Sequence, residues 1–565
     1  MLKTSDFRDI GRFYICYSIY SANGFIALRT MIDKSSSRLR LTQLKAGLNK
    51  WRIAFLVFAL FYAVLLVLNL SNVPMQWDEV GQLNGGLLLK LGQYNTFVGH
   101  TFYPPLYEAV TMFFFNIFGV SMVSGRLVSA VFSVLTLWAA FELASNMYGH
   151  KAGLISAVLL AIMPGYFWLS RLALLDVTLV FFFTLSLLFF FRWLNNHQNK
   201  MLVLSGLALG LGFLAKYQVL AVGAVMIISI LILGWGQLKR LFAKFTLLIV
   251  TAVIVVIPWI IIAYRMLANQ NLNQWIYALQ MGNPASSLYS GRYPLPIFYL
   301  VEMTWPYNDI HPISLLLYIA GLSGLVLFAV RREKADKFVF IWFVSVFVFF
   351  TAIANKDWRY MLPLFPTLAI SASAFILFVY SKAENAWRGQ ISLNRKRMVK
   401  FAAGLLIVFV AVAMVYSVYD TYHWVAKYDI QIDIQQATNY AMNHDNANQS
   451  IMVLCPFNFF SNQMVDFYLL ADGENQIQTY QYLQLPVDTY TPNFNITEFI
   501  SLCSQNNVKY VFTYEYGGTV PYFNTTLDLM QIYTQLYASG NFSAISPQQT
   551  FGSDPRRIFI INFTG

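Results

Sequence analysis

The stretch IAFLVFALFYAVLLVLNL, residues 53–70, determines the class of fold because it is apolar throughout and carries no charge. A helix of this length spans the hydrocarbon layer of a membrane. The stretch begins too far from the N-terminus for a cleavable signal peptide, and Trp77-Asp78-Glu79 follows it where a cleavage site would need small residues. We therefore expect a membrane-spanning helix here.

The rest of the chain has the composition of a multi-pass membrane protein. Of its 565 residues, 58% are hydrophobic and only 11% are charged, against about 25% charged in a typical soluble domain. Disordered, collagen-like and disulfide-stapled classes are excluded, and the three cysteines lack the spacing of a structural zinc site. Eleven further apolar runs lie near residues 105–120, 127–145, 152–168, 174–191, 202–215, 218–234, 245–264, 311–329, 337–353, 361–380 and 401–419.

The net charge of +12 is unevenly distributed along the chain. Residues 421–565 contain 4 basic and 11 acidic residues, so residues 1–420 carry 34 basic and 15 acidic residues. The basic residues form short clusters between apolar runs, which is a signal of membrane topology and not of a nucleic-acid groove. We expect membrane lipid, and no nucleic acid, as a partner.

Sequons and basic clusters predict the topology. The basic N-terminus is expected in the cytoplasm, whereas sequons are glycosylated only on the translocated side. Such a chain crosses the membrane an odd number of times. If residues 105–120 do not cross, every strong basic cluster lies inside, which predicts about eleven crossings. The glycosylation candidates lie in the C-terminal tail and are Asn448, Asn495, Asn524, Asn541 and Asn562.

These patterns divide the chain into three parts. Residues 1–52 form a cytoplasmic basic segment, and residues 53–420 form a transmembrane catalytic domain with extracytoplasmic loops at 71–126 and 265–310. Short β-type runs alternate with helix-like stretches in residues 421–565, which predicts an extracytoplasmic α/β domain. Cys455 and Cys503 in that domain are either bonded to each other or free.

Residues that can carry chemistry recur where the spans are expected to reach the outer face. Each has a simpler explanation, because acids also cap helices and arginines also anchor at the membrane interface. Their number at one face nevertheless indicates a site. They are Asp78-Glu79, Tyr103-Pro-Pro-Leu106, Gly119 with Arg126, Arg171-Leu-Ala-Leu-Leu-Asp176, Gly210 with Lys216, and Asn355-Lys-Asp-Trp-Arg-Tyr-Met-Leu-Pro363.

The order of these motifs resembles the protein O-mannosyltransferase and aminoarabinose transferase clan of the glycosyltransferase C superfamily. The resemblance is best over residues 72–220 and returns at 354–368. It implies an enzyme that uses a sugar carried on a polyprenyl or dolichyl monophosphate. It also implies Asp78 as general base, Glu79 as a residue that positions the acceptor or the base, and Asp176 as a second acidic position.

The same resemblance implies that Arg126, Arg171 and Lys216 face the site. The sequence departs from the family pattern at Tyr103, where relatives often have lysine before the two prolines. His100 is a candidate for the missing cation. The acidic pair is Asp-Glu and not Asp-x-Asp, so a divalent metal is possible but not favoured, and no obligatory cofactor is expected.

The chemistry of a lipid carrier agrees with these residues. Its phosphate leaves as an anion, so the site needs cations more than an acid. The planar fork of arginine suits phosphate, and a carboxylate can take the proton of the acceptor hydroxyl. One direct displacement with inversion is then sufficient. Arg359 is the main candidate for the phosphate contact, with Lys356 beside it and Arg292 in the second large loop.

Two other classes of function compete with this interpretation. A transporter or flippase of lipid-linked sugars would place ionisable groups near the middle of the bilayer, and only Glu142 lies well inside a predicted span. An inactive scaffold is also compatible with the sequence. The donor sugar, with mannose or another hexose as the default, the acceptor (glycan, protein or lipid) and the oligomeric state are left open.

Overall fold

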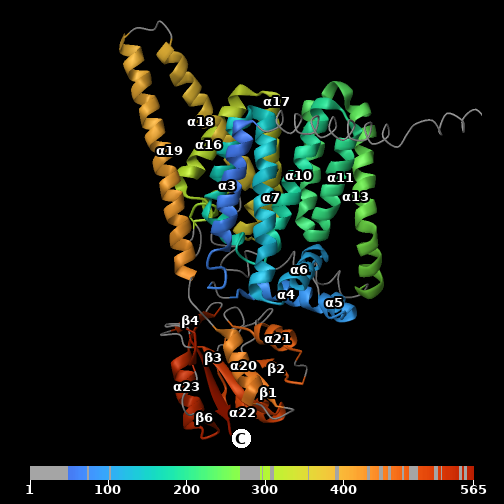
Figure 1. The fold of residues 1–565 in the computed structure, drawn as a ribbon, viewed down its shortest axis with the longest axis vertical. Helices are drawn as coiled ribbons and strands as arrows, with labels where there is room; N and C mark the ends of the chain where they lie inside the picture. Colours follow the sequence, from blue (N-terminus) through green and yellow to red (C-terminus); the bar gives the residue numbers. More distant parts are fainter. Residues whose placement is uncertain are drawn as a thin grey trace, which may run out of the picture. The chain divides into compact units, whose positions relative to one another are not determined.

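The computed structural model describes most of the chain beyond its N-terminal segment. The described residues form a bundle of helices, followed by a C-terminal region that contains a sheet (Figure 1). Residues 1–48 and Arg292 lie outside the described part, as do Asn448 and Asn524. The described residues are 49–72, 75–100, 103–267, 293–294, 297–305, 311–353, 356–388, 393–428, 433–444, 449–455, 460–473, 476–482, 494–514, 519–522, 525–545, 550–552 and 557–565.

The chain is an integral membrane protein and is mostly helical, as the sequence predicts. Seven stretches of the described residues are long and apolar enough to cross a membrane. They comprise α3 (Lys50–Val67), α7 (Met122–Tyr148), α10 (Leu175–Asn196), α13 (Leu238–Leu267), α17 (Lys334–Ala352), η3 (Trp358–Leu364) with α18 (Phe365–Arg388), and α19 (Leu393–Tyr428).

Shorter apolar helices complete the bundle, and together with the long ones they match the twelve apolar runs of the sequence. They are α6 (Leu106–Phe118), α8 (His150–Ala161), α11 (Asn199–Ala215), η1 (Tyr217–Leu220) with α12 (Ala221–Leu233), and α16 (Leu315–Arg331). The short elements α9 (Pro164–Leu169), η2 (Trp235–Gln237) and α15 (Phe298–Glu302) lie between them in the chain.

Helices α7, α10, α11 and α13 run side by side (Figure 1). α10 is buried on nearly every side, which is why its sequence is apolar all round and lacks the stripe of a surface helix. Serines join it to α11, since the hydroxyl of Ser186 donates to the carbonyl oxygen of Ser205 at 2.9 Å, and Ser205 returns the bond at 2.8 Å.

Three short helices connect α3 to α7. They are α4 (Trp77–Lys90), α5 (Tyr94–His100) and α6. Arg126 in the first turns of α7 donates to the carbonyl oxygen of Leu70, just beyond α3, at 2.8 Å. The chain therefore leaves α3 and enters α7 at the same end of the bundle. The odd number of crossings stays a prediction.

A mixed sheet forms the C-terminal α/β region, in the order β2-β1-β3-β8-β6 with β7 beside β8. β1 pairs in parallel with β2 and β3, and β8 is antiparallel to β3. The strands are β1 (Ser450–Leu454), β2 (Thr479–Gln481), β3 (Val508–Tyr514), β6 (Phe542–Ala544), β7 (Thr550–Phe551) and β8 (Ile558–Phe563), beside a hairpin of β4 (Thr519–Tyr522) and β5 (Thr525–Asp528).

Each face of this sheet is covered by helices. Side chains alternate along a strand, so Ile451 and Val453 point to one face of the sheet and Met452 and Leu454 to the other. The first face packs against α20 (Ile434–His444) and α21 (Asn462–Ala471). The second packs against α22 (Ile496–Gln505) and α23 (Leu529–Ala538). The result is a three-layer α/β/α arrangement.

The two cysteines of this region are both free and buried. Cys455 belongs to the core on the first face of the sheet and Cys503 to the core on the second. The sheet stands between them, so of the two alternatives that the sequence leaves open, the structure has the free thiols.

The first face of the sheet shares its core with α4. Val80, Leu83 and Leu87 of α4 are buried together with residues of α20 and α21. The Asn84 side chain donates to the carbonyl oxygen of Gln463 at 3.2 Å. One side of α4 is thus fixed by the C-terminal region, while its N-terminal turn carries the acidic pair.

Candidate active site

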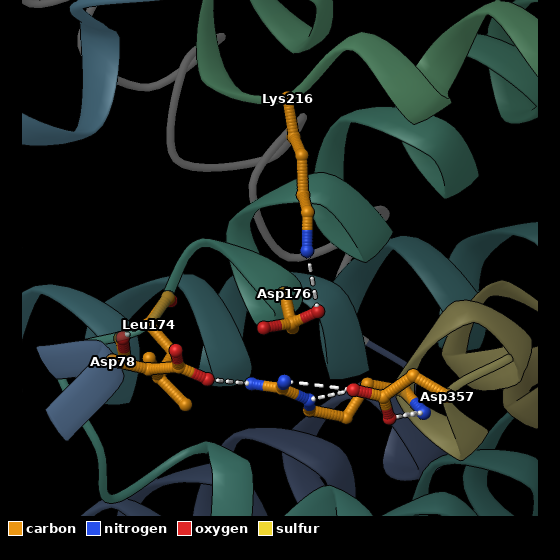
Figure 2. A network of polar contacts seen from close by, with 7 residues as sticks. Asp78, Leu174, Asp176, Lys216 and Asp357 are labelled. Carbon is orange, nitrogen blue, oxygen red and sulfur yellow. Dashed lines mark hydrogen bonds and ion pairs between the residues drawn. The ribbon is translucent and has the colours of Figure 1, made fainter. Parts of the chain in front are cut away.

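Asp78 and Arg359 form the accessible part of the candidate site. Asp78 lies in the first turn of α4, and its Oδ2 accepts a hydrogen bond from Nη1 of Arg359 at 2.6 Å (Figure 2). The two side chains keep 26% and 28% of their surface exposed. Both charges can therefore be reached by a ligand without unfolding of the surrounding helices.

Arg359 is held by a second carboxylate, that of Asp357. Its Nε and Nη2 lie 2.8 and 2.7 Å from Oδ2 of Asp357 (Figure 2). Asp357 also caps η3, because its Oδ1 accepts from the main-chain N–H of Arg359 at 2.9 Å. The planar guanidinium thus bridges two carboxylates and is held in a fixed plane.

Asp176 and Lys216 form the deeper part of the same network. Asp176 begins α10, Lys216 follows α11, and the ammonium lies 2.8 Å from Oδ1 of the carboxylate (Figure 2). Burial alone would lower the pKa of Lys216, but the charge of Asp176 outweighs it and raises that pKa above its ordinary value. The ring of Tyr103 lies 5.6 Å from the ammonium. Arg359 is within electrostatic range of Asp176, so the two pairs act as one network.

Glu79, the neighbour of Asp78, points to a different partner. Its two oxygens accept from Nε and Nη2 of Arg126 at 2.8 and 2.6 Å, and neither side chain has exposed surface. The main-chain N–H of Ala173 donates to the same carboxylate at 2.7 Å. Glu79 and Arg126 thereby join α4, α7 and the segment before α10, which fixes the turn that presents Asp78.

Arg171 and Lys356 bond to main-chain oxygens at helix ends. Arg171 donates to the carbonyl oxygens of Leu68 and Asn69 at 2.8 and 3.1 Å, so it closes the end of α3. Lys356 donates to carbonyl oxygens at the end of α17, among them that of Thr351 at 2.6 Å, and burial lowers its pKa. Their predicted contact with the substrate stays a prediction, as does that of Arg126.

The remaining candidates are placed as follows. Tyr103 contributes its ring beside Lys216, whereas Arg292 and the side chain of His100 lie outside the described residues. Among the sequons, Asn495 caps α22 by accepting from the N–H groups of Thr497 and Glu498. Asn541 and Asn562 lie at or in the strands β6 and β8, and use of these sites for glycosylation stays a prediction.

Asp357 was missed at the level of sequence. It stands two residues before Arg359, a spacing that allows an acid both to cap a short helix and to pair with the arginine. That spacing is visible in the sequence, whereas the pairing of Arg359 with Asp78, 281 residues away along the chain, is not.

No group of three acidic, histidine or cysteine side chains within the described ranges is close enough to hold a metal ion. Asp78 and Asp176 instead each meet a cation from another element. The expectation that a divalent metal is not obligatory stays a prediction.

Comparison with known proteins identifies relatives of the chain. Residues 103–262 match the model of the family described as dolichyl-phosphate-mannose-protein mannosyltransferase. The undecaprenyl phosphate-alpha-4-amino-4-deoxy-L-arabinose arabinosyl transferase of Yersinia pestis is 28% identical over 270 residues. The match covers 46% of each chain, so it spans about half the length of this curated relative.

Solved structures share the fold over a longer stretch. The crystal structure of ArnT from Cupriavidus metallidurans bound to undecaprenyl phosphate has a TM-score of 0.57 at 14% identity, covering 91% of this chain and 98% of that one. The archaeal oligosaccharyltransferase AglB from Archaeoglobus fulgidus, in complex with an inhibitory peptide and a dolichol-phosphate, has a TM-score of 0.55 at 14% identity. That match covers 82% of this chain and 69% of AglB.

Proposed function

We propose that the chain is a glycosyltransferase of the glycosyltransferase C superfamily, and that it transfers a sugar from a polyprenyl or dolichyl monophosphate carrier to an acceptor hydroxyl. The acceptor belongs to a protein, a glycan or a lipid on the extracytoplasmic side of a cell or endoplasmic-reticulum membrane. Structural neighbours that hold undecaprenyl phosphate or dolichol-phosphate support this class of carrier. Mannose or another hexose is the sugar that we expect.

The accessible Asp78–Arg359 pair is the observation that carries the proposal. Arg359 neutralises Asp78, and the two are partly exposed. A lipid phosphate is a doubly hydrogen-bonding anion that competes with Asp78 for the guanidinium. Binding of the donor therefore releases Asp78 to accept a proton, so the base becomes free only when the phosphate is in place.

The chemical step follows as one displacement. The oxygen of the acceptor hydroxyl attacks the anomeric carbon as its proton passes to Asp78. The bond between that carbon and the phosphate oxygen breaks, and the lipid phosphate leaves with the electron pair toward Arg359. Attack from the side opposite the phosphate inverts the anomeric configuration.

The other residues of the network position these groups. Lys216 brings a second positive charge near the leaving phosphate, and Asp176 keeps that lysine protonated and fixed at 2.8 Å. Glu79 and Arg126 are fully buried, and their ion pair fixes the first turn of α4. We therefore assign them a positioning role, in which they act through Asp78.

A reconstituted transfer assay tests the proposal. The purified protein in liposomes is given radiolabelled polyprenyl-phosphate hexoses and a panel of hydroxyl acceptors, with and without a metal chelator. We expect transfer by the wild type that survives the chelator and falls by at least about 100-fold in Asp78→Asn. Glu333→Gln, at an exposed acid on the opposite end of the bundle, is the matched control and keeps full activity.

The same assay separates the rival class. Equal activity of Asp78→Asn and the wild type removes Asp78 from the role of base. Movement of the labelled lipid between leaflets without transfer to any acceptor indicates a flippase of lipid-linked sugars instead.

A further inference from the structure

Asp78 is the first residue of a stripe along one side of α4, which continues with Gln82 and Gly85. The proposed function gives a role only to Asp78 at the start of this stripe. Residues four and seven positions further, Gln82 and Gly85, lie on the same side of an α-helix as Asp78. The opposite side of α4 is occupied by the core that it shares with α20 and α21. The stripe therefore continues, along α4, the side on which Asp78 meets Arg359.

Glu108 of α6 reaches this stripe because Gly85 has no side chain. A Cβ at Gly85 would lie 2.7 Å from Cγ of Glu108 and 3.3 Å from the ring of Phe97. The Glu108 side chain thus packs directly on the main chain of α4. Any larger residue at position 85 would displace it.

Two oxygens along the stripe are buried without a hydrogen-bond partner among the described residues. They are Oε1 of Gln82 and Oε2 of Glu108, and Glu108 keeps only 3% of its surface exposed. Buried acceptors of this kind cost free energy unless a donor is supplied. A bound ligand with hydroxyl groups would supply such donors.

The position of Glu108 connects it to the rest of the site. Tyr217 lies within electrostatic range of both Glu108 and Tyr103. Tyr103 in turn stands over the ammonium of Lys216 at 5.6 Å. Glu108 is thus linked through Tyr217 and Tyr103 to the surroundings of Lys216.

We propose that Gln82 and Glu108 form a subsite for the ring hydroxyl groups of the transferred sugar, and that this sugar carries no charge where it faces Glu108. The inference rests on the proposed function. The rise along α4 from Asp78 to Gln82 is about 6 Å, which is comparable with the width of one sugar ring. In the proposed donor complex, the sugar ring between Asp78 and the phosphate held by Arg359 is the one being transferred.

The surroundings of Glu108 favour a neutral sugar over an amino sugar. No ion pair reaches Glu108 from the residues that the structure describes, and burial raises its pKa to about 8. A carboxyl that carries its proton both donates and accepts a hydrogen bond, as a sugar hydroxyl does. A glutamine can take over both functions, whereas it cannot take over an ion pair with an ammonium group.

Variants of Glu108 and a series of donors test the subsite in the full-length protein in liposomes. For a neutral hexose donor, we expect Glu108→Gln to keep kcat/KM within about threefold of the wild type. Glu108→Leu is expected to lose about 10- to 100-fold. We also expect one donor that lacks a single sugar hydroxyl to react more slowly than the complete donor with the wild type. With Glu108→Leu the two donors should react equally well, because this variant already lacks the hydrogen bond to that hydroxyl.

Controls address folding and position. Thr111→Val on the same helix removes a hydroxyl that bonds to its own helix at 3.0 Å, and it should leave kcat/KM unchanged. Gly85→Ala displaces Glu108 without removing it and should reproduce the loss seen with Glu108→Leu. A loss in Glu108→Leu together with unchanged kcat/KM in Thr111→Val separates the subsite from a general defect of α6.

Four outcomes overturn the inference. Unchanged activity of Glu108→Leu removes the subsite. If Glu108→Gln loses as much kcat/KM as Glu108→Leu, and the wild type prefers a 4-amino donor, the subsite binds a cationic sugar. Sensitivity to the hydroxyls of the acceptor, with none to those of the donor, assigns the subsite to the acceptor. Absence of any transfer by the wild type overturns the proposed function, and the subsite with it.

Discussion

Asp78 and Glu79 are adjacent acids with opposite environments. Successive residues of an α-helix point about 100° apart, so Asp78 meets Arg359 at a partly exposed position and Glu79 meets Arg126 in a fully buried one. The sequence presents them as one motif. The structure separates a group that a ligand can reach from a group that holds the scaffold.

The buried pair leads to a prediction on stability. In Glu79→Gln the guanidinium of Arg126 stays buried without its counter-charge, so we expect the free energy of unfolding to fall by about 3–5 kcal/mol. Thermal unfolding in detergent measures the change. Glu333→Gln is the control, because Glu333 is 62% exposed and its pair with Arg331 contributes about 1 kcal/mol or less. An equal, small effect of both variants would contradict the structural role of Glu79.

At the scale of elements, α16 and α18 approach each other through glycines. The hydroxyl of Ser371 donates to the carbonyl oxygen of Gly321 at 2.8 Å. A Cβ at Gly324 would overlap the carbonyl group of Ser371, which belongs to the main chain and cannot move alone. Close contact of the two helices therefore depends on Gly324.

This contact predicts different results for two glycine substitutions. Gly324→Ala should separate α16 from α18 and destabilise the protein by about 1–3 kcal/mol. Gly223→Ala on α12 meets nothing within 4 Å and should change stability by about 1 kcal/mol or less, in the stabilising direction. Thermal unfolding of both variants is the measurement. A neutral Gly324→Ala would show that the two helices can shift apart without cost.

Asp466 couples α21 to β2 and makes the C-terminal region sensitive to pH. Its Oδ1 accepts from the hydroxyl of Thr479 at 2.5 Å, and burial raises its pKa to about 6. The folded state therefore favours the protonated acid. Stability is highest below the unfolded pKa of about 4 and is lost as the pH rises through about 6.

Asparagine at this position should remove that dependence. Asp466→Asn keeps an acceptor for Thr479 and cannot ionise, so at pH 7.5 we expect it to be more stable than the wild type by about 1–3 kcal/mol. At pH 3.5 the two should be equal. Hydrogen exchange of residues 460–482 at both pH values is the measurement. A stabilisation of the same size at both pH values would exclude Asp466 ionisation as its cause.

At the scale of the whole molecule, the two ends of the bundle differ in their charged groups. The acids and cations of the candidate site lie at the start of α10 and the end of α11. Lys334 donates to the carbonyl oxygen of Leu194 near the opposite end of α10 at 2.7 Å. Arg331 and Asp336 form an ion pair of 2.5 Å close to it. Lys334 and Arg331 thus lie away from the candidate site, and by the positive-inside rule we predict that their end of the bundle faces the cytoplasm.

This separation predicts the sidedness of labelling. In sealed cells, an impermeant maleimide should label Asp472→Cys in the C-terminal region, whereas Lys200→Cys at the start of α11 should be labelled only after permeabilisation. Both positions are exposed, and Cys455 and Cys503 are buried, so the background from these two is expected to be low. The reverse pattern would invert the proposed topology.

Hydropathy alone located the twelve apolar helices of the bundle, because an apolar run is a local property of the sequence. The same holds for the α/β alternation of the C-terminal region, although its strand order depends on pairings such as β1 with β3 that no local pattern reveals. The chain also carries a sixth sequon, Asn69-Leu-Ser71, outside the C-terminal tail. Asn69 accepts a hydrogen bond from Arg171, so this sequon lies at the end of the bundle that carries the site.

The candidate site was recoverable only in part. Asp78 and Lys216 stand in motifs and were identified, whereas Gln82 and Glu108 acquire their meaning from the contact of α4 with α6. The roles of the arginines were the hardest to predict. A conspicuous cation such as Arg171 binds main-chain oxygens at the end of a helix, and nothing in the residues around it distinguishes that from binding phosphate.

Because α4 packs against the C-terminal region and also carries Asp78, a movement of that region changes the position of Asp78. α4 is a short rigid rod with the C-terminal core on one side and Asp78 on its first turn. Rolling this rod by about 20° displaces the tips of its side chains by about 2 Å. A misplacement of about 1 Å can slow catalysis by about 100-fold. A protein that binds the surface of the C-terminal region could thus lower kcat by displacing Asp78, without contacting the sugar.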